Sequence, residues 1–463
     1  MYYENYIKLK KQLNIETKFA FNHKIIYSLL PFRTRSIKEV NFSHGCLPII
    51  GVLGRITLGK QLELQEEDAI VNYMLGTEDI DFEYGEDEQD FKLLLQEYLG
   101  GIKLNIFNPY LFLFVPLFDL GIENLGVKMA QFINEVFFKD IDLSEFFSGK
   151  NTNDDNIILE FIISNLKDLK EEKNKSEEYF VPKCMENVVD VIRNDFLFLL
   201  SHEDFLVKNF DLIISFYLNF YFTQFVLKNS SFDDSKNLME AYYVLDWERV
   251  SKNRGENPKG YKLFEKHLSN LLYSMEIVEH LNTLLGTNSL LIPELVTFYD
   301  NLNKKDQEDV LKYFKKIMID MVNSDEKIDE SKINEIEGYQ TFKELINYYE
   351  DFLKDFAKKL DRTSPFTKYH DGIEKLCTKY FVKGRGRYSN MFNITQDMLM
   401  VITAISIQYT DKIRFNKLIE EFRRRGLFFD EESSTRIKER FNTLNLIDTK
   451  SDIGDEAYVK SIL

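Results

Sequence analysis

The sequence predicts a mainly α-helical protein, in which a multi-helical body is followed by a C-terminal winged helix-turn-helix module. The chain has 463 residues but only 8 Pro and 20 Gly, so helix breakers are scarce. Apolar residues recur at three- and four-residue spacing through most of it. Three short helical patterns and a hairpin signal close the chain. We expect a mixed segment over 1–90, the helical body over 91–378, a basic Gly/Arg linker over 379–391 and the winged-helix-like domain over 392–463.

The first segment matches the phosphate-binding spacing G-x-x-x-x-G-K from Gly54 to Lys60, and residues 47–53 before it are apolar enough to form a strand. The match fails at Gln61, because the motif needs Ser or Thr there to bind Mg²⁺. No later strand ending in a second metal-binding carboxylate is apparent. We therefore expect a glycine-containing turn and no nucleotide hydrolysis.

The body reads as one helix after another. One apolar segment, 210–227, is long enough to cross a membrane, but its polar residues Asp211, Ser215, Asn219 and Thr223 recur at every fourth position. That spacing forms one stripe along a helix, which a lipid-facing helix would not carry. We expect a buried helix in a soluble, cytoplasmic protein without membrane contact. The other predicted helices span 91–99, 122–138, 156–172, 186–200, 261–285, 307–322 and 342–360.

No complete catalytic or metal-binding set emerges. Cys46, Cys184 and Cys377 form no C-x-x-C pair, which excludes a disulfide framework and fits a reducing cytoplasm. His370 and Asp371 are adjacent, but no further histidine follows at metal-ligand spacing on a helix. We expect no catalytic residues, no metal and no cofactor.

Two basic segments are candidates for nucleic-acid binding. "KYFVKGRGRYSN" (379–390) carries Lys383, Arg385 and Arg387 among glycines and aromatic residues. Guanidinium groups bind phosphate in bidentate fashion, and aromatic rings stack on bases; the alternative is a flexible linker. "WERVSKNRGENPKGYK" (247–262) carries Arg249, Lys252 and Arg254, and it is either a contact with DNA or an acidic partner, or a solvated loop.

The charge distribution favours the C-terminal end for such contacts. The net charge of −17 argues against a surface that lies wholly on nucleic acid. From residue 379 onward, however, 15 Lys and Arg face 12 Asp and Glu. Any nucleic-acid contact is therefore expected in this part.

The C-terminal domain is predicted to contain helices over 395–408, 415–425 and 431–444, followed by a hairpin that turns at 452–455. Ser433, Arg436, Arg440 and Thr443 share one face of the third helix, a suitable face for DNA. The start of this helix and the hairpin are acidic, so docking onto a partner protein is the alternative. The acidic residues are Asp430, Glu431, Glu432, Asp448, Asp452, Asp455 and Glu456, and the candidate partner-binding residues are Asp452, Asp455 and Tyr458.

Three segments resemble DNA phosphorothioation-dependent restriction proteins of the DptG (DndG) type. They are "LLPFRTRS" (29–36), "LDWERVSKNR" (245–254) and the C-terminal "RRRGLFFDEESSTRIKERFNTLNLIDTKSDIGDEAYVKSIL" (423–463). The most specific motif is K-S-D-S-G-D-A-x-Y-V, from which the chain departs at Ile453 and Glu456. It keeps Lys450, Ser451, Asp452, Gly454, Asp455, Tyr458 and Val459.

The resemblance implies a bacterial defence complex that damages DNA lacking backbone sulfur. It implies DNA as a partner, beside an ATPase subunit and a helicase-like translocase subunit, and it assigns no catalytic residues. We expect a non-catalytic DNA-binding or bridging subunit of this complex. The alternatives are a stand-alone winged-helix transcriptional regulator and, third, a cryptic nuclease or NTPase.

Overall fold

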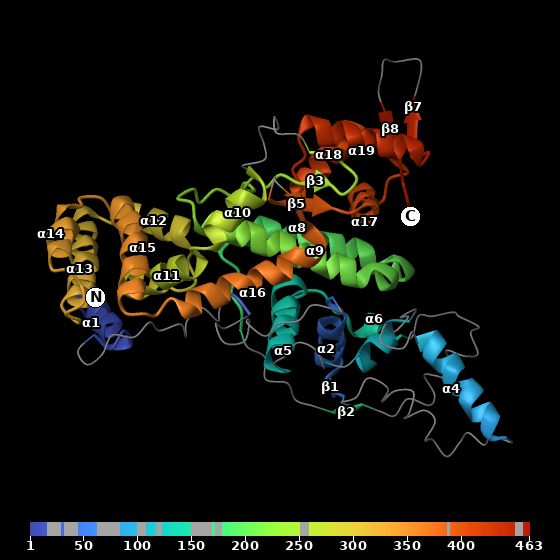
Figure 1. Ribbon diagram of the computed structural model, residues 1–463, viewed down its shortest axis with the longest axis horizontal. Coiled ribbons are helices and arrows are strands. Elements are labelled where there is room, and N and C mark those ends of the chain that lie inside the picture. Colours follow the sequence, from blue (N-terminus) through green and yellow to red (C-terminus); the bar gives the residue numbers. More distant parts are fainter. Residues whose placement is uncertain are drawn as a thin grey trace. The chain divides into compact units, whose positions relative to one another are not determined.

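Helices dominate the protein, as the sequence predicts (Figure 1). The structure is a computed structural model. It describes residues 1–15, 29–31, 45–62, 84–99, 108–115, 117, 123–149, 169–171, 178–250, 259–386, 389–449 and 457–463. Two compact units are present, and they combine segments that are distant in the sequence. Unit 1 comprises Met1–Lys38, Tyr179–Val191 and Leu218–Ser461, and unit 2 comprises Glu39–Glu178, Ile192–Tyr217 and Ile462–Leu463.

Unit 2 is built around helix α2 (Leu47–Leu58), where a strand and a glycine turn were expected. That expectation is wrong, and the reason is close packing. A Cβ atom on Gly54 would lie 2.8 Å from side-chain carbons of both Leu113 and Phe147, so the glycine lets the helix approach its neighbours. Gly59, with φ of +62°, ends the helix in the left-handed conformation. The two glycines of the G-x-x-x-x-G-K match thus serve a buried helix, and no phosphate-binding loop is formed by these residues.

The other elements of unit 2 range from two-residue strands to a 15-residue helix. The helix predicted over 122–138 is confirmed as α5 (Glu123–Phe132) continued by the π-helical turn η4 (Ile133–Phe137). The helix predicted over 156–172 lies mostly outside the described residues, and residues 170–171 of it are strand rather than helix. The remaining elements are β1 (Lys60–Gln61), antiparallel to β2 (Lys170–Glu171), α4 (Gly85–Leu99), the 3₁₀ helix η3 (Pro109–Phe114) and α6 (Ser144–Ser148).

Two long helices contribute residues to both units: α8 (Glu186–Leu200) and α9 (Glu203–Asn229). In the described part of the chain, α9 is the one helix long and apolar enough to cross a membrane, but 89% of its most apolar window is buried within the protein. The core helix of a soluble protein has the same character. Two residues of its polar stripe bond internally: Ser215 contacts Cys46 Sγ, and Asn219 donates to the Tyr243 hydroxyl.

The helices predicted over 307–322 and 342–360 are confirmed as α13 (Lys304–Val322) and α15 (Phe342–Lys359). Figure 1 shows α1 (Tyr2–Gln12) beside α13, against which it packs. The predicted helix over 261–285 is interrupted at Ser269 and Asn270, which separate α10 from α11. The helices are η5 (Lys183–Met185), α10 (Tyr261–Leu268), α11 (Leu271–Leu285), α12 (Ile292–Asp300), α13 (Lys304–Val322), α14 (Ser331–Gly338), α15 (Phe342–Lys359) and α16 (Ser364–Phe381).

One strand of a three-stranded sheet, and the start of a second, lie in the segment expected to be a linker. Strand β5 (Asn390–Ile394) is central, with β4 (Val382–Gly384) antiparallel on one side and β3 (Val244–Leu245) parallel on the other. In Figure 1, β3 lies among the orange and red C-terminal elements. The described part of 379–391 is therefore the end of a helix and a hairpin rather than a flexible connection.

From residue 396 onward, the described residues form helices and short strands. Helix α17 (Gln396–Ile407) is followed by β6 (Lys412–Arg414), α18 (Phe415–Arg424), α19 (Glu431–Thr443), β7 (Ile447–Thr449) and β8 (Ala457–Lys460). The three strands form an antiparallel sheet in the order β6-β8-β7. The side chains of Thr395 and Asp430 cap α17 and α19. The turn of the hairpin, 450–456, lies outside the described residues.

Candidate nucleic-acid interface

The connection after α9 runs alongside the C-terminal elements, and residues 242–249 of it are here termed the strap. Its backbone is paired there: the N–H of Tyr243 donates to the Phe428 carbonyl, and the N–H of Asp246 donates to the Ile394 carbonyl, each at 2.9 Å. Glu248 is only 4% exposed and accepts a hydrogen bond from the Ser433 hydroxyl at 2.9 Å. The strap is therefore fixed against the first turn of α19.

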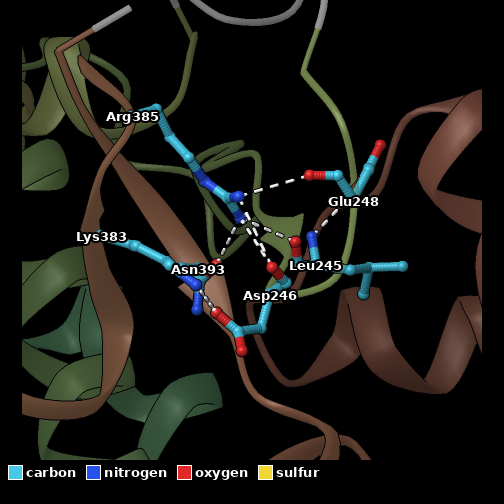
Figure 2. A network of polar contacts seen from close by, with 6 residues as sticks. All are labelled: Leu245, Asp246, Glu248, Lys383, Arg385 and Asn393. Carbon is cyan, nitrogen blue, oxygen red and sulfur yellow. Dashed lines mark hydrogen bonds and ion pairs between the residues drawn. The ribbon is translucent and has the colours of Figure 1, made fainter.

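Arg385 holds the strap from its other side (Figure 2). Its guanidinium donates to the carbonyl oxygens of Leu245 at 2.8 Å and Glu248 at 3.3 Å, and to Oδ1 of Asn393 at 2.9 Å. Lys383 forms an ion pair with Asp246. Both residues were predicted to bind phosphate. The structure gives Arg385 internal contacts, because its two terminal nitrogens donate to protein oxygens, while its buried Nε has no hydrogen-bond partner among the described residues.

A pocket of about 470 Å³ opens between the strap and α19. Trp247 is 37% exposed, and the Arg440 guanidinium carbon lies 5.7 Å from the centre of its ring. Arg249 and Arg436 line the same pocket, together with Glu248, Glu439 and Thr443. Three candidate residues, Arg249, Arg436 and Arg440, are thus brought together from two segments that lie far apart in the sequence.

The arginines of the pocket differ in how strongly other protein groups bind them. Arg436 pairs with Glu439 at 2.8 Å, and about half of each side chain is exposed, so this pair is weakly held. Arg440 donates to the Gln396 side chain, while its Nε is buried and has no hydrogen-bond partner among the described residues. Arg249 is exposed. The pocket therefore presents more positive than negative charge to a ligand.

The predicted DNA-facing side of α19 is only partly open. Ser433 was placed on that face, but its side chain is fully buried against Glu248, because the strap covers the first turn. Arg436 and Thr443 remain exposed. Of the other candidates, Tyr458 lies on β8, where it accepts a hydrogen bond from Nε of Arg414 at 3.2 Å. Arg387, Lys252, Arg254, Asp452 and Asp455 lie outside the described residues.

The His370–Asp371 pair gains one neighbour in the structure. The ligand atoms of His370, Asp371 and Glu374 lie within 4.8 Å of one another on α16. Glu374, however, accepts a hydrogen bond from the Tyr261 hydroxyl at 2.5 Å, and Asp371 accepts one from the His370 ring at 3.1 Å, depending on the tautomer. Proximity along one helix explains the group.

Trp247 is the residue that sequence reasoning overlooked. It is the single Trp of the chain, and the signal available was its place between charged residues in "LDWERV", ahead of a basic run. No protein-family model matches the sequence, and no curated protein is significantly similar to it. The DptG-type resemblance therefore stays an expectation. One of its segments, 245–254, overlaps the strap.

Proposed function

We propose that this chain is a non-catalytic DNA-binding or bridging subunit of a bacterial DNA phosphorothioation-dependent restriction complex, with a winged helix at its C-terminus. One observation carries the DNA-binding role: Arg249, Arg436 and Arg440 gather around Trp247 beside α19. Arginines that converge on one open surface are suited to phosphate oxygens. The defence system itself is inferred from the resemblance of the three sequence segments.

The order of the C-terminal elements supports a winged helix. In helix-turn-helix proteins the recognition helix lies in the major groove while neighbouring elements contact the backbone. Helix α19 would be that helix, and β7 with β8 would form the wing. The exposed Arg436 of α19 lines the same pocket as Arg249 of the strap. The strap would therefore extend the contact with DNA beyond the helix.

The same surface favours phosphate binding over reading of bases. Helix α19 begins with Asp430, Glu431 and Glu432, and the residues at this end of a recognition helix are those that meet base edges. Carboxylates there would repel the DNA phosphates, and the Asp430 side chain already caps the helix. We therefore propose binding that depends on charge and not on sequence.

Binding of the purified chain to several unrelated duplexes of equal length tests this proposal. Equal affinities are expected, together with an equal loss for every duplex in the Arg249→Gln/Arg436→Gln variant. A stand-alone regulator would instead dimerise and select one palindromic site. Such selection would overturn the proposal.

The restriction complex is tested in the native host. Tagged chain should co-purify with an ATPase subunit and a helicase-like translocase subunit, and deletion of its gene should abolish damage to DNA that lacks backbone sulfur. Full restriction in the deletion strain would remove the chain from the complex. Reintroducing the Arg249→Gln/Arg436→Gln variant then shows whether assembly survives when DNA contact is weakened.

A further inference from the structure

We propose that the pocket between the strap and α19 binds one unpaired nucleotide of DNA, with its base stacked on Trp247 and its phosphate held by Arg249 and Arg436. This inference rests on the proposed DNA-binding function and names the form of DNA that the pocket takes. A base within a duplex is stacked and paired on both sides, so it cannot enter a side pocket without leaving the helix.

The case for a base begins with the exposed indole. Trp247 keeps 37% of its surface exposed inside a pocket of about 470 Å³, a volume within the roughly 300–1,000 Å³ of small-ligand sites. Indole rings and guanidinium planes are the surfaces on which unpaired bases stack. The Arg440 guanidinium is already next to the ring, so the pocket offers both kinds of surface.

The case for a phosphate rests on the arginines at the same pocket. Arg249 is exposed, and Arg436 forms a half-exposed ion pair with Glu439. A phosphate group can bind Arg436 beside the Glu439 carboxylate or in its place. Arg249 and Arg436 would then both bind one anion. The Glu439 carboxylate and the Thr443 hydroxyl line the pocket as well, and they supply an acceptor and a hydroxyl for the edge of a base.

The strap makes the pocket rigid before any ligand arrives. The residues on either side of Trp247 are fixed: the Asp246 N–H donates to the Ile394 carbonyl, and Glu248 is bound to Ser433. Arg385 holds the strap carbonyls from the other side. Arg385 is therefore a positioning residue for Trp247, and less binding free energy is lost in ordering the site.

Fluorescence of the full-length protein tests the inference directly, because Trp247 is the chain's single Trp. Three ligands are compared: oligothymidylate of about 12 nucleotides, a blunt duplex, and heparin, a polyanion without bases. We expect the oligothymidylate to quench Trp247 emission strongly, and the duplex and heparin to leave it nearly unchanged. Binding of labelled oligothymidylate with unaltered Trp247 emission would overturn the inference.

Substitutions separate stacking from charge. Trp247→Leu should weaken oligothymidylate binding about tenfold and duplex binding less than twofold, while Trp247→Phe, which keeps an aromatic face, should restore most of the loss. If wild-type protein binds neither duplex nor single strand, the proposed function fails and the pocket inference falls with it. If duplex binding depends on Arg249 and Arg436 but Trp247→Leu and Trp247→Phe bind single strands as wild type does, only the nucleotide pocket is wrong.

Discussion

The hydroxyl of Ser433 donates a hydrogen bond to Oε2 of Glu248 across 2.9 Å, although the two residues are 185 positions apart in the sequence. Both side chains are buried, with exposed fractions of 0% and 4%. Glu248 belongs to the strap and Ser433 to the first turn of α19. Their bond sets Trp247 and Arg249, the two neighbours of Glu248, beside the arginines of α19.

Removing this bond should loosen the strap. In Ser433→Ala the buried Glu248 oxygen loses its hydroxyl donor, and we expect the free energy of unfolding to fall by about 1–3 kcal/mol. Ser434→Ala, one position further along α19, is the matched control and should change it by less than about 0.5 kcal/mol. Urea unfolding measures both. Equal effects of the two substitutions would contradict the proposed link.

Arg385 and Lys383 should contribute different amounts to the free energy of unfolding. Arg385→Gln leaves strap carbonyls without their charged donor and should cost about 1–3 kcal/mol of unfolding free energy. Lys383 and Asp246 are 44% and 42% exposed, so Lys383→Gln should cost less than about 1 kcal/mol. If Arg385→Gln left stability intact and reduced only the affinity for DNA, Arg385 would be a phosphate contact rather than a clamp.

Gly426 is expected to tolerate no side chain. Its φ is +77°, and a Cβ atom there would lie 2.3 Å from a ring carbon of Phe220. Gly426→Ala combines backbone strain of about 1–2 kcal/mol with overpacking of about 1–3 kcal/mol. Gly386→Ala is the control, since Gly386 has φ of +59° with nothing within 4 Å of its added Cβ. Thermal unfolding should separate the two variants, and equal losses would disprove the packing contribution.

The stability of the protein should fall in alkaline solution, in part through Cys184. Burial, together with the charge of Glu294, raises the pKa of the Cys184 thiol from 9.0 to about 12. Between these values the unfolded chain loses the thiol proton before the folded chain does, so the unfolding free energy decreases as the pH rises from 9.0 to about 12. The difference in unfolding free energy between wild type and Cys184→Ala should narrow over this window. A difference that is constant with pH would refute this assignment.

Sequence reasoning found the helices whose ends carry strong signals. The helices predicted over 186–200 and 431–444 begin at the same residues as α8 and α19. Sequence reasoning did not predict α2. Glycines in an apolar segment usually indicate a turn, and they favour a helix here only because other parts of the chain pack closely against them. That close approach to Leu113 and Phe147 is a tertiary contact, which local spacing does not reveal.

The candidate interface was predictable in its residue types but not in its assembly. Arg249, Arg436 and Arg440 stood out as basic residues on exposed segments. Their meeting depends on the strap, whose two-residue strand β3 is too short to give a periodic pattern. The internal contacts of Arg385 could not be predicted from the sequence for the same reason. The oxygens that accept its hydrogen bonds are backbone carbonyls of that strap.

The central claim is that Arg249 and Arg436 bind DNA phosphates, and the salt dependence of duplex binding tests it most directly. The slope of log affinity against log salt should flatten by about 1.8 in Arg249→Gln/Arg436→Gln, at roughly 0.9 for each lost phosphate contact. Arg423→Gln/Arg424→Gln removes two exposed arginines of α18 and should leave the slope unchanged. An unaltered slope in the first variant, or equal flattening in both, would contradict the proposed interface.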